Sequence, residues 1–305
     1  MKNIIYFILA SLISSQVMAA YKFKVVSRPV GVKALTFVQN ADTQEKYYNQ
    51  LIDYAQLEKM APLSSADLAS VTAEDIRTLS MEEFNQLYAR LSAGPMPLGD
   101  YSGYILQKPP VYNAVKKRIL KQASVFANFL GIVKNACNRE AEDCLFEFIW
   151  KGKRFLPADK MDQIETLTTI NFGSSALTKF TPDILKGVIP SSIKAGIVNA
   201  ADRLSFTGLP MHVYCGESLV DTRRESIITD GAFADDFANY SKLTDEVITR
   251  KGLKITEEYR MVRPGLYIGK AYSNKLFLFN VALEISGSAP STQLADTCFD
   301  GKTTR

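Results

Sequence analysis

Between residues 99 and 283 the chain contains a series of short segments rich in β-branched and aromatic residues. Gly, Pro, Asn or Lys residues bound these segments, as is typical of β-strands. The expected strands are Tyr101–Leu106, Leu145–Trp150, Thr166–Phe172, Met211–Cys215, Glu225–Thr229, Thr256–Val262, Leu266–Tyr272 and Leu276–Leu283. Arg263-Pro264-Gly265 and Ser273-Asn274-Lys275 are typical of hairpin turns. Because short strands need paired edges, we expect them to close into one antiparallel barrel.

A helical region precedes the strands. It contains three helix starts in succession, each with a Ser or Thr three residues before an acidic residue. Only Ser80 with Glu83 forms a full capping box, since the other two starts carry Asp in place of Glu. Those two starts are Ser64 with Asp67 and Thr72 with Asp75. The third start opens a predicted helix over Met81–Leu91, which Gly94-Pro95 ends. Another helix is expected around Thr43–Lys59.

Two amphipathic helices, Val111–Val133 and Pro182–Leu204, interrupt the strand series. Each has an apolar face to bury, so we expect both to pack against or over the barrel. Lysines crowd the first half of Val111–Val133, and peripheral contact with an anionic membrane surface is therefore a second interpretation of that helix. The expected fold class is α+β. The expected boundaries are 1–19 signal peptide, 20–98 mainly helical region, 99–285 β-barrel with helical insertions and 286–305 tail.

The first residues have the three parts of a cleavable export signal. Lys2 supplies a positive charge, Ile4–Ile13 is apolar, and a short polar stretch ends at Ala19-Ala20. The apolar run is about half of the ~20 residues that a membrane-spanning helix needs. We therefore expect a periplasmic or secreted protein.

The four cysteines agree with an oxidising compartment, where an even count favours disulfides. Cys137 and Cys144 bracket a short polar loop that can close on itself. This leaves Cys215 to pair with Cys298, an arrangement that would tie the C-terminal tail to the body of the protein.

The composition and motifs exclude several functional classes. A net charge of +4 is too small to indicate nucleic-acid binding. No Cys-x-x-Cys pair exists, and the spacing of Asp221, Asp230, Asp235 and Asp236 does not match a calcium loop, so no metal or cofactor is expected.

His212 is the only histidine, and no Gly-x-Ser-x-Gly motif accompanies it. Cys215 lies three residues away along an expected strand, so the two side chains point to opposite faces. A structural role for His212 is favoured, and no catalytic residue is assigned.

Three segments together resemble a family of small lipocalin-like β-barrel proteins. Gly99-Asp-Tyr101-Ser-Gly103 resembles the Gly-x-Trp-x-Gly opening of those barrels, with Tyr101 in place of the tryptophan. Trp150-Lys-Gly-Lys-Arg-Phe155 is similar to the segment that follows in that family, and Arg263–Tyr272 to its closing strand pair. The resemblance implies a barrel that holds an apolar small molecule and carries no catalytic residues.

The leading hypothesis is therefore a non-enzymatic protein that binds an apolar small molecule or lipid inside a barrel. Candidate lining residues offer aromatic walls and a few polar anchors. They are Tyr101, Trp150, Lys153, His212, Tyr214, Arg260 and Tyr267. The alternatives are a hydrolase that acts on lipid or cell-envelope material through His212, and a secreted factor that binds another protein.

The export signal gives the first prediction. Signal peptidase should remove residues 1–19 or 1–20, because small residues stand at the recognised positions. N-terminal sequencing of the exported protein should begin at Ala20 or Tyr21. A mature, membrane-bound form that still begins at Met1 would contradict this.

Overall fold

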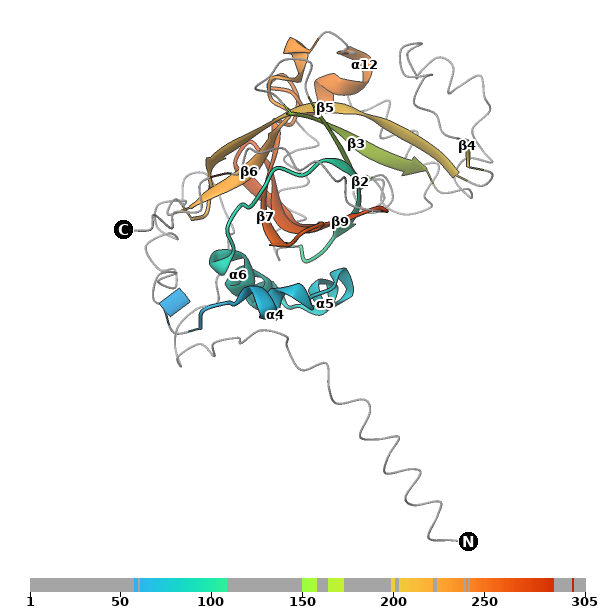
Figure 1. Ribbon diagram of the computed structural model, residues 1–305. Coiled ribbons are helices and arrows are strands. Elements are labelled where there is room, and N and C mark those ends of the chain that lie inside the picture. The colour runs from blue at the N-terminus through green and yellow to red at the C-terminus, as the bar shows by residue number, and fades with distance from the viewer. Residues whose placement is uncertain are drawn as a thin grey trace, which may run out of the picture.

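The fold is an antiparallel β-sheet that curls into a barrel (Figure 1). The computed structural model describes residues 58–59, 61–108, 150–157, 164–172, 199–200, 203–221, 224–237, 240, 242–287 and 298. Its strands are β1 Gly99–Ile105, β2 Trp150–Pro157, β3 Ile164–Phe172, β4 Asn199–Ala200, β5 Arg203–Glu217, β6 Glu225–Asp230, β7 Ile255–Arg263, β8 Leu266–Ser273 and β9 Leu276–Ile285. In the described ranges, no helix is long and apolar enough to cross a membrane.

Strand pairing closes the sheet into a ring. The order is β3-β2-β1-β9-β8-β7-β6-β5-β4, and β3 also pairs with β5. This additional pairing runs from Ile164 opposite Val213 to Phe172 opposite Leu204. Because β1 pairs with β9 and β3 pairs with β5, the described strands form a ring. The short strand β4 lies outside this ring and pairs with β5. Closure of this kind removes the exposed edges that promote aggregation.

The turns that connect the last strands have the backbone that tight hairpins need. Gly265, between β7 and β8, has a φ of 80°, and Asn274 and Lys275, between β8 and β9, have φ values of 48° and 66°. Two successive residues with positive φ suit a two-residue hairpin, whose twist matches that of the strands. Both hairpin connections expected from the sequence are confirmed.

Two apolar clusters lie on opposite faces of the sheet. The first combines buried residues from β1, β2, β5, β6, β7, β8 and β9, and is therefore the barrel interior. Tyr259 on β7 and Val281 on β9 belong to it. The second joins the outer face of β7–β9 to the helices, and includes Val262 and Ala282. Period-two alternation thus divides each strand between an inner and an outer core.

The outer core is covered by three helices, α4 Ser65–Ala69, α5 Ala73–Thr78 and α6 Met81–Arg90, which lie together on one side of the sheet (Figure 1). All three begin with a reciprocal capping box. The expectation that Ser64 and Thr72 lack a full box is therefore wrong. Asp67 and Asp75 reach back to the backbone N–H of their N-cap residues, at 3.0 and 2.7 Å.

The connection between β6 and β7 contributes to a further cluster. It contains η5 Ala234–Asp236, α12 Lys242–Asp245 and η6 Glu246–Ile248, and Figure 1 places α12 on the side away from α4–α6. Ala234, Phe237 and Ile248 pack there with Met211 of β5.

Most of the expected strands are found, with two corrections. The segment Leu145–Trp150 was expected to be a strand that ends at Trp150, but β2 begins there, and residues 145–149 lie outside the described residues. The end of the expected helix Pro182–Leu204 is also wrong, because residues 199–200 and 203–204 are extended and pair with each other. The rest of that helix, Val111–Val133, residues 43–57 and the 1–19 signal fall outside the described residues, as does Cys137 with Cys144.

The expected disulfide between Cys215 and Cys298 is confirmed, with a Cα–Cα distance of 5.4 Å and a sequence separation of 83 residues. Cys298 is buried in the interior cluster, and the bond fixes this residue against β5.

Reduction of this disulfide should destabilise the protein by about 4 kcal/mol, because a long loop loses its closure constraint in the unfolded chain. Urea unfolding with and without dithiothreitol measures the difference. A Cys137→Ser/Cys144→Ser background isolates the bond under test. Equal unfolding midpoints in the oxidised and reduced protein of that background would contradict the expectation.

Candidate functional site

An ion pair crosses the interior of the barrel. Lys153 Nζ on β2 lies 2.8 Å from Glu257 Oε2 on β7, and the two side chains are 0% and 7% exposed. Strands β2 and β7 are not neighbours in the sheet, so this contact has to span the interior. Lys153 Nζ also lies 3.1 Å from Met211 Sδ on β5. The barrel interior therefore holds a charged pair beside its apolar core.

Three donors converge on one oxygen of Glu257. Thr229 Oγ1 and Tyr259 OH each donate to Oε2 at 2.8 Å, in addition to the Lys153 ammonium. Burial, together with the Glu257 carboxylate, raises the pKa of Tyr259 well above its usual value, so this hydroxyl keeps its proton and serves as a donor. The second oxygen, Oε1, has no hydrogen-bond partner within the described part of the chain.

Trp150 lies on the same inner wall, at the start of β2. Its ring rests on the backbone of β1, because a Cβ added to Gly103 would come within 2.5 Å of the ring atom Cζ3. The ring packs against the interior cluster. Its indole Nε1 is buried and has no hydrogen-bond partner among the described residues. A buried N–H without an acceptor is rare in native proteins.

Aromatic residues near the start of β1 fill another part of the interior. The Tyr101 ring meets those of Phe155 and Tyr267 edge to face, with centroids 5.5 and 5.8 Å apart. The Tyr267 hydroxyl donates to the carbonyl of Pro95 at 2.9 Å. Burial raises the pKa of Tyr101 to about 12. These rings stay neutral and form an apolar wall.

Two other candidate residues lie on the opposite face of β5 from Met211 and Val213. His212 stacks on Phe237, with centroids 4.2 Å apart and an angle of 23° between the rings. Tyr214 is 43% exposed and donates to Asp230 Oδ2 at 3.2 Å. The structure does not bring either side chain together with Tyr101, Trp150 and Lys153.

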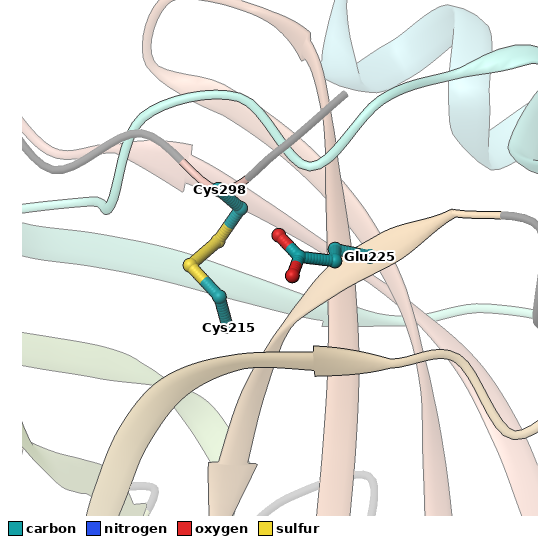
Figure 2. Close-up of side chains that lie close together, drawn as sticks. All are labelled: Cys215, Glu225 and Cys298. Atoms are coloured by element: carbon teal, nitrogen blue, oxygen red, sulfur yellow. A yellow bond between two sulfur atoms is a disulfide. The ribbon is translucent and has the colours of Figure 1, made fainter. Parts of the chain in front are cut away.

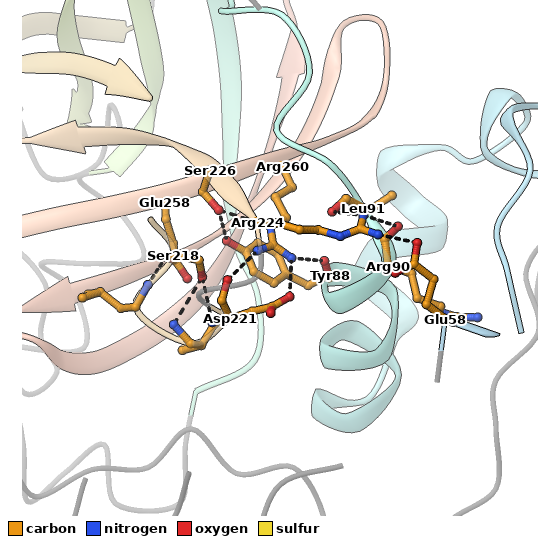
Figure 3. A network of polar contacts seen from close by, with 12 residues as sticks. Glu58, Tyr88, Arg90, Leu91, Ser218, Asp221, Arg224, Ser226, Glu258 and Arg260 are labelled. Carbon is orange, nitrogen blue, oxygen red and sulfur yellow. Dashed lines mark hydrogen bonds and ion pairs between the residues drawn. The ribbon is translucent and has the colours of Figure 1, made fainter. Parts of the chain in front are cut away.

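Arg260, the last of the seven candidates, is fully buried between the barrel and α6 (Figure 3). Its Nη1 donates to the carbonyl of Tyr88 at 3.0 Å and to Asp221 Oδ2 at 3.2 Å, and its Nε to Ser226 Oγ at 3.1 Å. The guanidinium lies 4.6 Å from the centre of the Tyr88 ring. The structure therefore places Arg260 at the helix–barrel interface, on the outer face of β7.

One group of potential metal ligands occurs within the described ranges, formed by Cys215, Glu225 and Cys298 (Figure 2). Their ligand atoms all lie within 4.8 Å of one another. The two sulfurs are bonded to each other, and a metal would need them as thiolates. In this oxidation state the group is a disulfide with a neighbouring carboxylate.

Sequence reasoning missed Glu257 and Thr229. A signal for Glu257 was present, since Glu257, Tyr259 and Met261 alternate along one predicted strand while Glu258, Arg260 and Val262 alternate on its other face. Charges on both faces of a strand between apolar neighbours indicate that at least one charge is buried and paired.

The chain matches no protein-family model and no curated protein sequence.

The position of Arg260 predicts a structural role. Arg260→Leu should lower the free energy of unfolding by about 3–5 kcal/mol, because it removes one side of a buried ion pair with Asp221. As a control, Arg154→Leu removes an exposed ion pair with Asp100 and should cost less than about 1 kcal/mol. Urea denaturation of both variants tests this. Equal losses of unfolding free energy in the two variants would contradict this prediction.

Proposed function

We propose that the protein is an exported, lipocalin-like binding protein that holds an apolar small molecule or lipid inside its barrel. The observation that carries this proposal is the buried indole N–H of Trp150 on the inner wall, which has no hydrogen-bond partner in the described part of the chain. A bound molecule with an acceptor oxygen would supply the missing partner.

The character of the inner wall supports a small-molecule site. Such sites are mostly apolar and carry a few polar groups that fix the orientation of the ligand. Here the apolar wall includes Tyr101, Phe155 and Tyr267, and the polar groups are the Trp150 indole and the Glu257 carboxylate. An eight-stranded barrel is of the size that holds side chains or one small ligand.

Two large interior rings lie along the wall. The Trp150 ring covers Gly103, and the Tyr259 ring covers Gly269, where an added Cβ would come within 2.6 Å of the ring atom Cδ1. Each glycine faces inward and lets the ring lie flat on the neighbouring strand.

The alternatives have weaker support. A hydrolase would use His212, whose ring is stacked on Phe237 on the other face of β5 from the interior core residues. For a protein-binding factor, the exposed large hydrophobic side chains among the described residues are Tyr214 and Phe233, at 43% and 46%. Ligand binding inside the barrel is therefore the function that we propose.

Trp150 is the only tryptophan in the chain, so its fluorescence reports directly on this site. Adding an apolar fluorescent fatty alcohol or a lipid extract to the delipidated protein should change the Trp150 emission. It should also raise the melting temperature, because the ligand binds the folded state. Native mass spectrometry of the protein as purified should show a small molecule bound.

His212→Ala is the matched control, because it alters β5 outside the interior and should leave binding unchanged. Trp150→Phe keeps an aromatic side chain, removes the indole N–H donor and should weaken binding by about 1 kcal/mol, as for loss of one hydrogen bond. Because this variant has no tryptophan, its binding is measured by the shift in melting temperature. The proposal fails if no lipid or apolar compound alters the Trp150 emission or the melting temperature.

A further inference from the structure

We propose that Glu257 is the polar anchor of this ligand, and that the group it recognises is an uncharged hydroxyl rather than a carboxylate. This inference rests on the proposed function and specifies the class of ligand. The site would then suit a long-chain alcohol, or another apolar molecule whose polar end is a hydroxyl.

The hydrogen bonds around Glu257 determine which partner can be added. Oε2 already accepts from Lys153, Thr229 and Tyr259, each at 2.8 Å. Thr229 and Tyr259 direct their hydroxyl protons to this oxygen. Oε1 has no hydrogen-bond partner among the described residues. A carboxylate oxygen only accepts, so a molecule that meets Oε1 has to bring a donor.

The charges lead to the same conclusion. Lys153 and Glu257 form an ion pair of opposite charges inside the barrel, where their side chains are 0% and 7% exposed. A ligand carboxylate would add a buried negative charge beside Glu257, and a ligand ammonium would add a buried positive charge beside Lys153. Either would lose its hydration without a compensating charge. A hydroxyl brings a donor and adds no charge.

The Trp150 indole complements this arrangement. Its buried N–H is a donor on the same inner wall, at the start of the strand that carries Lys153. It can meet an acceptor oxygen of the ligand, and a hydroxyl oxygen or an ester carbonyl can fill that role.

Three probes with the same alkyl chain test the proposal on the unmodified protein: 1-dodecanol, dodecylamine and dodecanoate, titrated at pH 8 below their aggregation limits. Trp150 emission and the melting temperature are the measurements. Dodecanol should bind at least about ten-fold more tightly than dodecanoate or dodecylamine, because only it pairs with Oε1 without an added charge. If no probe binds and no other apolar compound does, the proposed function itself is wrong. If dodecanoate binds as tightly as dodecanol, ligand binding stands and the role of Glu257 is overturned.

Two variants test whether Glu257, rather than the rest of the inner wall, sets the preference for a hydroxyl. Glu257→Gln leaves Lys153 buried without a counter-charge and can lose its fold, so the Lys153→Met/Glu257→Gln double variant is made with it. The double variant removes both charges and keeps the volume. Circular dichroism verifies folding. In the folded variant the preference for dodecanol over dodecanoate should become smaller, since the repulsion by the Glu257 carboxylate is gone while the cost of burying the ligand carboxylate remains. An unchanged preference would overturn the assignment.

Discussion

Strand β7 is buried on both faces and carries charged side chains on both. The elements that pack against each face of β7 supply the partners of these charges. Glu257 faces the barrel interior, while Glu258 and Arg260 face the helices. A buried charge without a partner costs several kcal/mol, so each has to be satisfied by an element packed against that face. On the inner side this element is β2, through Lys153. On the outer side it is α6 together with the segment around Asp221.

The outer face shows how closely the helical region depends on the barrel. Lys270 on β8 donates to Asn85 of α6 at 2.6 Å and to Asn280 of β9 at 3.0 Å. Burial lowers its pKa well below the usual value, and Glu258 offsets part of this effect. The amine also lies 5.1 Å from the ring centres of Phe84 and Tyr88. Helix α6 therefore supplies both polar and aromatic partners to Lys270. Without the helix, this buried amine would lose contacts that the sheet alone does not provide.

The sequence predicted the strands well because alternation and turn residues are local signals. Residues 256–262, 266–272 and 276–283 lie within β7, β8 and β9, and the hairpins between them follow from Gly265 and Asn274. The pairing of β3 with β5 could not be predicted, since it depends on a register between segments far apart in the chain. Glu257 was missed for a related reason. A charge in a strand is usually solvent-exposed, and its partner Lys153 lies about a hundred positions earlier in the sequence.

Stability alone does not explain the pair inside the barrel. Apolar side chains of similar volume generally stabilise a core as well as a buried ion pair does, or better. A pair that served only the fold would also be expected to have its hydrogen-bonding capacity satisfied, as buried polar networks generally are. Here the indole N–H of Trp150, on the same inner wall as the pair, is buried without a hydrogen-bond partner among the described residues. Under the proposed function, a hydroxyl-bearing ligand would offer an acceptor to this N–H or a donor to Glu257 Oε1, and either contact would give the polar groups of the inner wall a role beyond stability.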